Sequence, residues 1–373
     1  MGAGGTVVRA EARRRWALVL AVVVLLGSVP AVLAAWPVRA ARIDAGVLRE
    51  RIAASAAQPY HGFAQSTGLL GLPPLRNLEQ VTALVSRTTQ MRTWYAGPDR
   101  GRVDVVGGGT ERDLYRTPDG QYVWDYGANQ LTRVVGDQPV RLPTAADLTP
   151  PELARRLLAL AAGDRVEPLA GRRVAGVAAA GLRIVPAAPG TTVAHVDVWA
   201  DPASGLPLQA ELTAKGGARP VFVSRFLEVT LGVPDARVLT PPAARPGMGF
   251  TVTAVPDVLG ALNRWQRSAG LPDRLAGQPR RDAVDGTDAV GVYGTGLARF
   301  VVLGVPRRFG AEAYDNAEAF GRSIEMPGGR AALLATGLLT VLVVQGDRTY
   351  LAAGLVEPAT LERAAADLAG AAA

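Results

Sequence analysis

Short runs of alternating apolar and polar residues dominate the first two-thirds of the chain. Each run is five or six residues long, and the segments between the runs are rich in glycine, proline, aspartate and asparagine. Because such residues permit or impose turn geometry, closely spaced runs predict an antiparallel meander. The runs are Met91–Tyr95, Arg102–Val106, Glu111–Arg116, Gln121–Tyr126 and Leu131–Val135.

One of these runs indicates how the sheet is covered. Tyr122, Trp124 and Tyr126 share one face of the predicted strand, whereas Gln121 and Asp125 share the other. Successive side chains of a strand point to opposite faces. The pattern therefore predicts a half-buried sheet with one aromatic face.

A helical period precedes the meander. Ile43, Val47, Leu48 and Ile52 recur at helical spacing and predict an amphipathic helix over residues 43–57. A strand is expected at residues 60–67, after the proline that ends this helix. Periodicity does not decide whether the apolar positions between residues 78 and 84 belong to a helix or to a strand.

A second helix interrupts the strands after residue 148. Thr149 is suited to cap it, Pro150 suits the first turn, and Glu152 lies three residues after the cap. An apolar stripe follows, and we expect Gly163 to end the helix. Strands then resume, with a hairpin turn over residues 201–205. The expected strands are Arg172–Val177, Leu182–Val185, Val193–Ala200, Leu206–Ala214 and Val221–Leu231.

A proline-rich stretch divides the chain. Residues 234–249 contain four prolines separated by small residues and predict an extended linker. Residues 43–233 form the first expected domain, and residues 250–373 form a small α+β domain. Its polar segment 276–288 is expected to be a loop, and its C-terminal helix is expected over residues 358–368. Its expected strands are Phe250–Val255, Val290–Tyr293, Leu297–Val305, Leu338–Val344 and Thr349–Leu355.

The N-terminal 40 residues predict export. Arg13, Arg14 and Arg15 precede an uncharged stretch from Trp16 to Val38. Basic residues before an apolar segment place the start of the chain in the cytoplasm and the remainder outside it. The length suits a membrane anchor, while small residues at 32–34 suit a cleavage site, so residues 1–40 are either a transmembrane anchor or a signal peptide.

Charge and cysteine content narrow the class of protein. The chain has 373 residues and a net charge of +7, and Lys215 is its one lysine. Its arginines are scattered and do not form a stripe, so nucleic acid is not an expected partner. With no cysteine, the chain has neither a disulfide framework nor a lipid-modified cysteine.

Enzymatic chemistry finds little support among the polar residues. The two histidines, His61 and His195, lie far apart in sequence, and there is no thiol, so no metal or other cofactor is expected. No Gly-x-Ser-x-Gly elbow is present. Asp104, Asp113 and Asp125 all lie on predicted strands, which leaves a hydrolase with paired carboxylates as an alternative.

Large apolar side chains mark a candidate ligand site on the predicted sheet. Two interpretations remain open for them: a core packed against the two helices, or a hydrophobic cavity that accepts an acyl chain or a lipidated peptide. The candidates are Phe63, Trp94, Leu114, Trp124, Trp199, Phe222 and Phe226.

The order of these segments resembles that of the LolA/LolB/RseB superfamily, which includes outer-membrane lipoprotein-sorting proteins. The resemblance covers residues 43–242 and is most specific at Val174-Ala175-Gly176 and at Trp199-x-Asp201-x-x-x-Gly205-x-Pro207-Leu208. It implies a mainly β, α+β fold: a half-open antiparallel β-barrel capped by helices, which holds lipid or acyl chains. Residues 293–300 and 354–361 are similar to the small second domain of RseB/MucB-like regulators of a sigma factor.

The resemblance implies a non-enzymatic, extracytoplasmic protein that senses lipid or lipoprotein and acts on a membrane partner such as an anti-sigma factor. Three alternatives remain open. A LolA-like carrier would use the same cavity to shuttle lipid or lipoprotein, and an envelope hydrolase would use the carboxylates. A purely structural interaction module would have a filled core.

Overall fold

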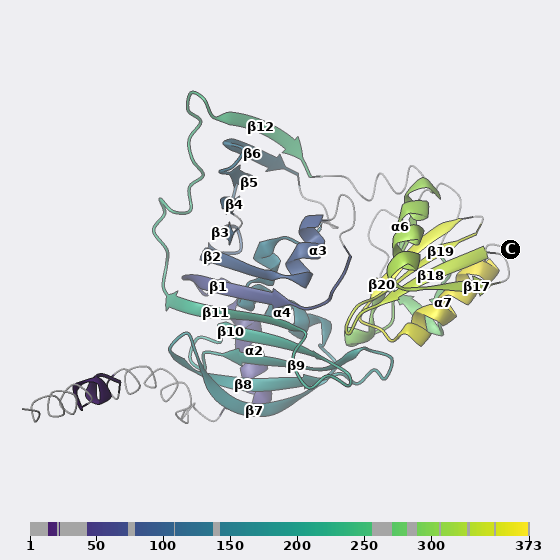
Figure 1. The fold of residues 1–373 in the computed structure, drawn as a ribbon, viewed down its shortest axis with the longest axis horizontal. Coiled ribbons are helices and arrows are strands. Elements are labelled where there is room, and N and C mark those ends of the chain that lie inside the picture. Colours follow the sequence, from purple (N-terminus) through teal and green to yellow (C-terminus); the bar gives the residue numbers. More distant parts are fainter. Residues whose placement is uncertain are drawn as a thin grey trace, which may run out of the picture.

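The computed structural model describes residues 14–20, 22, 43–73, 79–107, 109–136, 142–255, 271–281, 289–305, 307–326, 329–346 and 348–371. It shows a mainly β, α+β fold built on two sheets (Figure 1). The first is a mixed sheet of 12 strands and the second is an antiparallel sheet of eight. The expected fold class is confirmed at this level.

The first sheet runs in the order β12-β6-β5-β4-β3-β2-β1-β11-β10-β9-β8-β7. Its two end strands, β12 and β7, do not pair with each other among the described residues, so the sheet is not a closed barrel. The strands are β1 (Tyr60–Gly68), β2 (Thr88–Gly97), β3 (Arg100–Gly107), β4 (Thr110–Thr117), β5 (Gly120–Asp125), β6 (Gln130–Val135), β7 (Arg165–Val174), β8 (Val177–Val185), β9 (Val193–Ala200), β10 (Pro207–Ala214), β11 (Phe222–Leu231) and β12 (Gly249–Ala254).

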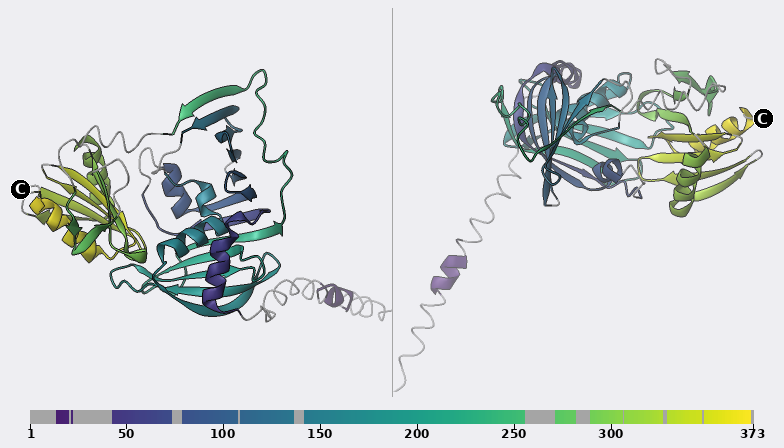
Figure 2. Two further views of the ribbon diagram at one scale, coloured as in Figure 1. Left: turned by 180° about the vertical axis from the view of Figure 1, so that it is seen from behind. Right: turned by 90° about the horizontal axis from the view of Figure 1, so that it is seen from above.

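Helices pack against one side of this curved sheet (Figure 2). Helix α2 (Ala45–Ala54) continues into the 3₁₀ turn η1 (Ser55–Ala57) and crosses β7 and β8. Helix α3 (Glu79–Ser86) lies beside β1, and α4 (Pro150–Leu160), preceded by η2 (Ala145–Leu148), covers β10 and β11. The undecided segment before residue 86 is thus helical.

The first helix agrees with its predicted period except at one position. The Asp44 side chain caps it by accepting from the backbone of Gly46 and Val47, and Leu48 and Ile52 are fully buried. Val47, which we expected in the apolar stripe, is 42% exposed. The buried stripe is therefore narrower than the sequence indicates.

Thr149 was predicted to cap α4, and the structure does not show the hydrogen bond that this prediction requires. Thr149 occupies the N-cap position, but its hydroxyl donates to the carbonyl of Ala146 and caps nothing. The capping box forms one turn earlier, between Thr144 and Asp147, where it starts η2. The helix ends at Leu160, before the predicted Gly163.

Two strand predictions in the first sheet need correction. Strand β7 begins at Arg165, seven residues before its predicted start. Residues 165–171 were not predicted to be a strand, because Pro168 and Gly171 are typical turn residues. Phe250–Val255, which we placed in the second domain, instead lies largely in β12, which pairs in parallel with β6 of the first sheet. The first sheet therefore extends past the proline-rich segment.

The second sheet runs in the order β13-β14-β15-β16-β20-β19-β18-β17. Helix α6 (Arg307–Phe320) and both strands of the β17–β18 hairpin were not predicted. Strand β14 lies within the segment 276–288 that we expected to be a loop; residues 282–288 lie outside the described part. The strands are β13 (Arg274–Leu275), β14 (Gln278–Arg281), β15 (Val290–Tyr293), β16 (Phe300–Val305), β17 (Arg322–Met326), β18 (Gly329–Ala335), β19 (Thr340–Gln345) and β20 (Thr349–Gly354), with η3 (Gly296–Ala298) and α7 (Pro358–Ala371).

A short polar seam joins the two sheets. The Thr191 hydroxyl donates to the carbonyls of Leu297 and Leu355, and the Thr192 hydroxyl donates to that of Leu338 at 2.5 Å. Both threonines are at least 92% buried. At the rim, Lys215 forms an ion pair of 2.8 Å with Glu357.

The predicted export segment, residues 1–40, lies mostly outside the described part, which includes only residues 14–20 and 22 of it. Within the portion of the chain that the structure describes, no helix has the length and apolar character needed to cross a bilayer.

Candidate apolar-ligand face

Strand register divides the first sheet into two faces. Tyr60 lies opposite Tyr95, and both belong to the core that includes α2 and α4. We call this side the helix face. Because side chains alternate along a strand, His61 and its partner Trp94 belong to the other side, which we call the outer face.

The seven candidate residues do not share one face. Leu114, Phe222 and Phe226 lie on the helix face, since Leu114 pairs with Val103, and Phe226 pairs with Ala64. Phe63, Trp94, Trp124 and Trp199 lie on the outer face by the same register. The structure thus brings three of the seven to the side on which the helices pack.

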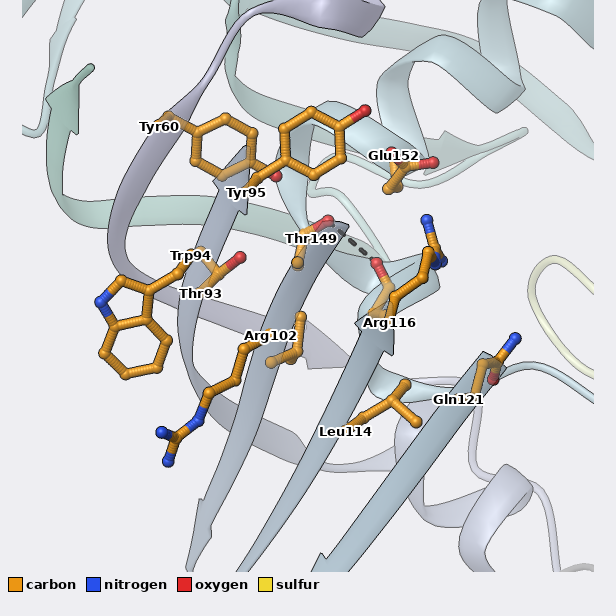
Figure 3. Close-up of a pocket in the computed structure, with 13 residues that line it drawn as sticks. Tyr60, Thr93, Trp94, Tyr95, Arg102, Leu114, Arg116, Gln121, Thr149 and Glu152 are labelled. Carbon is orange, nitrogen blue, oxygen red and sulfur yellow. Dashed lines mark hydrogen bonds between the residues drawn. The ribbon is translucent and has the colours of Figure 1, made fainter. Parts of the chain in front are cut away.

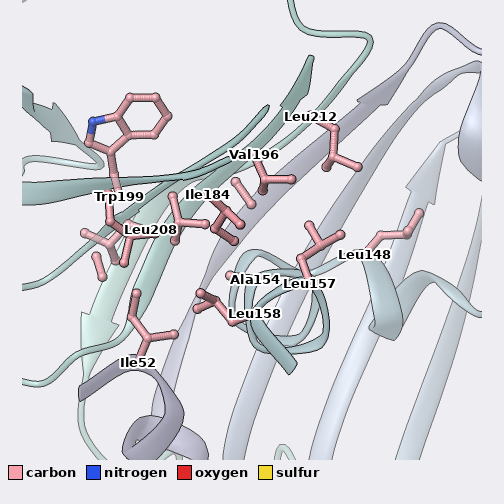
Figure 4. Packing of buried hydrophobic residues seen from close by; sticks show 14 of the residues in the cluster. Ile52, Leu148, Ala154, Leu157, Leu158, Ile184, Val196, Trp199, Leu208 and Leu212 are labelled. Carbon is pink, nitrogen blue, oxygen red and sulfur yellow. The ribbon is translucent and has the colours of Figure 1, made fainter. Parts of the chain in front are cut away.

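Trp199 is an outer-face candidate that is covered by protein groups. Its indole nitrogen donates to the carbonyl of Ala170, and the Arg172 guanidinium stacks 3.5 Å from the ring centroid. In Figure 4 its ring points away from Leu157 and Leu158 of α4. The side chain is 2% exposed, and it is covered by these neighbours on β7.

Over one half of the sheet the helix face is a filled core. Leu48 and Ile52 of α2 and Leu157 and Leu158 of α4 are all buried. They pack against buried residues of the sheet (Figure 4). The sheet residues include Leu182, Ile184, Val196, Val198, Leu208, Leu212 and Phe226. This half leaves no room for a ligand and provides much of the apolar burial of the unit.

Over β3, β4 and β5 the same face is only partly covered. Val105, Leu114 and Val123 lie on it, and each is half-buried. Val103 is buried on this face, whereas Tyr115 and Trp124 are buried on the outer face. The helix face is therefore well covered over β8–β11 and only partly covered over β3–β5.

A small hollow lies where the filled and uncovered halves meet. Tyr60, Tyr95, Val103 and Leu114 line it with Thr149 and Glu152 at the start of α4, and Figure 3 shows Tyr60 and Tyr95 above Leu114. Its volume is about 40 Å³, whereas an apolar pocket for a small organic ligand measures about 300–1,000 Å³. A longer apolar ligand would therefore have to lie along the uncovered face.

The two tyrosines fix the wall of this hollow. Their rings stack with centroids 5.2 Å apart, and the Tyr95 hydroxyl donates to the carbonyl of Ala56. Burial raises the pKa of both phenols. Both side chains are consequently neutral near pH 7, and they present ring surface, not charge, to the hollow.

Arginines flank the uncovered apolar residues. Arg112 and Arg116 lie on the helix face on either side of Leu114 on β4. Arg112 donates to the side chain of Gln80, and Arg116 donates to the carbonyl of Pro98. An apolar strip with guanidinium groups at its ends suits a ligand that has an apolar chain and an anionic head.

A polar cluster occupies the outer face of the same strands. Arg102 donates to Asp104 at 2.5 Å and to Asp113 at 2.8 Å, and both carboxylates are at least 99% buried. Arg102 also stacks on Trp94 and Tyr115. This cluster gives the outer face of the meander a polar core.

The proline-rich segment covers this cluster. Arg102 donates to the carbonyl of Val238, and Leu239 is 2% exposed. Met248 packs against the group of Tyr115, Trp124 and Leu131. The residues predicted to form an extended linker therefore lie against the outer face of the first sheet.

The acidic residues of this cluster do not form a good metal site or catalytic pair. Asp104, Glu111 and Asp113 have ligand oxygens within 4.8 Å of one another. These carboxylates already have cationic partners. Arg102 pairs with Asp104 and Asp113, and Arg92 pairs with Glu111 at 3.8 Å. With the pKa of Asp104 raised to about 7 by burial, the protonated cluster is close to neutral without an ion.

The carboxylates predicted for a hydrolase do not form a catalytic pair in the structure. Asp104 and Asp113 are buried beneath Arg102, whereas a catalytic pair must meet substrate and water. Asp125 lies on the opposite face from Asp113, because Asp113 pairs with Trp124. The two histidines are also apart: His61 is on β1 and His195 is on β9, with β10 and β11 between them.

No family model matches the chain, and no curated protein matches it. Among solved structures, it is similar to the Pseudomonas aeruginosa MucA/MucB complex, with 20% identity and a TM-score of 0.48 over 87% of this chain and 97% of that one. It is also similar to the LolA-superfamily protein NE2245 from Nitrosomonas europaea, with 12% identity and a TM-score of 0.23 over 54% of this chain and 99% of that one.

Both structures come from groups of proteins that the sequence resembles, and the similarity is one of fold alone. Because both TM-scores are below 0.5, the function of this chain has to be argued from its own residues.

Proposed function

We propose that this chain is a non-enzymatic, extracytoplasmic binding protein whose half-open first sheet accepts the apolar chain of a lipid or a lipidated peptide. The observation that carries the proposal is the change in burial along the helix face of the first sheet. The helix face is a buried core over β7–β11 and β1, whereas over β3–β5 Val105, Leu114 and Val123 are only half-buried. Contiguous apolar surface that the protein leaves partly exposed is a candidate binding site.

The proposed ligand has an anionic head. Arg112 and Arg116 lie beside the apolar strip, and guanidinium groups pair well with phosphate and carboxylate. A fatty acid, a phospholipid and an acylated peptide share this chemistry.

We further propose a regulatory role for the two-unit chain, in which the unit of the first sheet senses the ligand and the unit of the second sheet contacts a membrane protein such as an anti-sigma factor. MucB, to which the chain is similar in structure, has been crystallised in complex with MucA(peri). The N-terminal 40 residues would export the chain and either anchor it or be removed.

A carrier of lipid or lipoprotein would use the same face. Sequencing the N-terminus of the mature protein tests the carrier role, because a retained anchor prevents shuttling between membranes. A mature chain that keeps residues 1–40 would exclude the carrier, whereas one that begins near residue 35 is compatible with both roles.

Binding is tested with a pair of matched variants. Val123→Gln places an amide on the uncovered helix face, and Val135→Gln places one on the outer face at a position that is also half-buried. We expect the first to weaken binding of fluorescent palmitate at least tenfold and the second to change it less than twofold. Equal effects of the two variants, or no saturable binding to the wild type, would refute the proposed site.

A further inference from the structure

The two sheets have four edge strands among the described residues: β12 and β7 in the first sheet, and β13 and β17 in the second. Edge strands expose unpaired backbone groups, and proteins usually protect them with charges, proline, bulges or short length. Three of the four are protected in this way. Strand β7 contains four charged residues, Pro168 and a register shift; β17 contains Arg322 and Glu325; and β13 is two residues long.

Strand β12 has none of these protections. Its six residues, Gly249 to Ala254, include no charge and no proline. Phe250 is 51% exposed and Val252 is 54% exposed. Two threonines and a valine make it a good β-former, so it is the one described edge that is ready to accept another strand.

The amides available on this edge can be assigned from the ladder. Gly249 donates its N–H to Asn129, and Val255 donates its N–H to Val135, so the odd-numbered residues face β6. Successive amides of a strand point in opposite directions. The N–H groups of Phe250, Val252 and Ala254 therefore point away from the sheet.

A hollow lies beside the edge. Tyr122, Leu131, Leu239, Pro241 and Phe250 are among the residues that line it, and its volume is about 430 Å³. It lies on the outer face, between the proline-rich segment and the strands β5, β6 and β12. A side chain that projects from an added strand could occupy this space.

We propose that β12 binds an extended segment of another polypeptide by adding it to the first sheet as a thirteenth strand. Backbone hydrogen bonds to Phe250, Val252 and Ala254 would provide affinity, and an apolar side chain in the neighbouring hollow would provide specificity. The inference is independent of the proposed lipid site, which lies on the helix face.

Charge favours a separate, acidic partner over a second copy of this chain. Arg100 lines the hollow, Arg133 is the partner of Val252 on β6, and Asp119 is the acidic residue that lines the hollow. A two-fold pairing of two β12 strands would bring two such positive sets together, because a symmetric interface uses the same patch twice. The expected segment alternates apolar residues and carries at least one carboxylate.

The test uses a fluorescein-labelled, capped peptide of sequence Glu-Val-Thr-Val-Thr-Val-Glu and the exported part of the chain, residues 43–373. Val252→Pro removes an outward N–H without removing a hydrogen bond to β6, and proline is tolerated at such positions of edge strands. Val252→Thr keeps the amide and the branched side chain. Fluorescence anisotropy should show at least tenfold weaker binding for the proline variant and less than threefold change for the threonine variant.

Hydrogen exchange in the wild type is a second measurement that does not depend on whether the proline variant folds. In the wild type, the peptide should slow exchange of the amides of Phe250, Val252 and Ala254 at least tenfold and leave those of Thr251 and Thr253 unchanged. Unchanged exchange at the outward amides, or equal binding by both variants, would overturn the inference. Concentration-dependent dimers of the wild type that are lost in Val252→Pro would also overturn it, because they would assign the edge to a second copy.

Discussion

Asp104 and Asp113 lie directly opposite each other on β3 and β4, and one guanidinium, that of Arg102, donates to both. Their side chains each retain one buried oxygen without a protein hydrogen-bond partner. Burial is the main cause that raises the pKa of both carboxyls. This arrangement makes the stability of the first sheet depend on pH.

The pH dependence has a definite sign. The pKa of Asp104 rises from an ordinary value of 3.8 to about 7 in the folded chain. Its contribution to stability is therefore complete below about pH 4 and is lost as the pH rises through 7. Three pKa units set an upper limit of about 4 kcal/mol on that loss.

Asp104→Asn tests this prediction, because the amide resembles the protonated acid. We expect the melting temperature of the wild type to fall between pH 5 and pH 8 more steeply than that of the variant, measured by circular dichroism. Parallel pH profiles would show that Asp104 does not titrate in this range.

Removal of Arg102 should be strongly destabilising. Arg102→Met would leave two buried carboxyl groups without their cation, and breaking such a buried pair typically costs about 3–5 kcal/mol. Urea unfolding measures the loss. Arg92→Met is the matched control, because the Arg92 side chain is 52% exposed and its ion pair with Glu111 should contribute less than about 1 kcal/mol. Similar losses in both variants would contradict the account of the cluster.

The seam between the two sheets can be probed through the one lysine of the chain. Thr192→Val removes the hydroxyl that donates to Leu338 and leaves a buried carbonyl without that partner, which costs about 1–3 kcal/mol. Since Lys215 pairs with Glu357 across the seam, loosening it should raise the rate of Lys215 acylation severalfold.

Peptide mapping by mass spectrometry separates Lys215 from the N-terminal amine in this experiment. Thr253→Val, on the exposed edge strand β12, serves as the control and should leave the rate unchanged. An unchanged rate in Thr192→Val would mean that the hydroxyl does not hold the seam closed.

Much of the strand order was predictable, because turn residues separate the strands of the meander so regularly. Gly97, Gly120 and Gly205 adopt positive φ angles at three of these turns. The hairpin turn over residues 201–205 is confirmed, with Asp201 accepting from Ser204. Local chemistry of this kind is visible in the sequence without knowledge of the fold.

Pairing between distant strands was not predictable from local patterns. Trp199 and Phe226 are equally apolar and buried, yet the register of β9, β10 and β11 places them on opposite faces. Phe250 follows a proline-rich segment that indicates a boundary, but its strand returns to β6. Both facts depend on contacts between residues far apart in sequence. Residue propensities and the hydrophobic period do not report such contacts.

The sequence predicted an apolar ligand site on the sheet, but it identified only some of the residues that we now place in that site. Leu114 was found because it lies on a predicted strand of the meander, whereas Val105 and Val123 were missed. Valine is enriched in strands and carries no signal of its own in such a run. Only their partial exposure on the helix face distinguishes them.

The most direct test of the central claim is photo-crosslinking of a diazirine-labelled fatty acid to the exported part of the chain, with the modified residues mapped by mass spectrometry. We expect adducts to concentrate on the helix face of β3–β5, at or beside Val105, Leu114 and Val123, and we expect Val123→Gln to reduce their yield at least tenfold. Adducts on the outer face around Trp94 and Trp124, or an unmodified first sheet, would contradict the central claim.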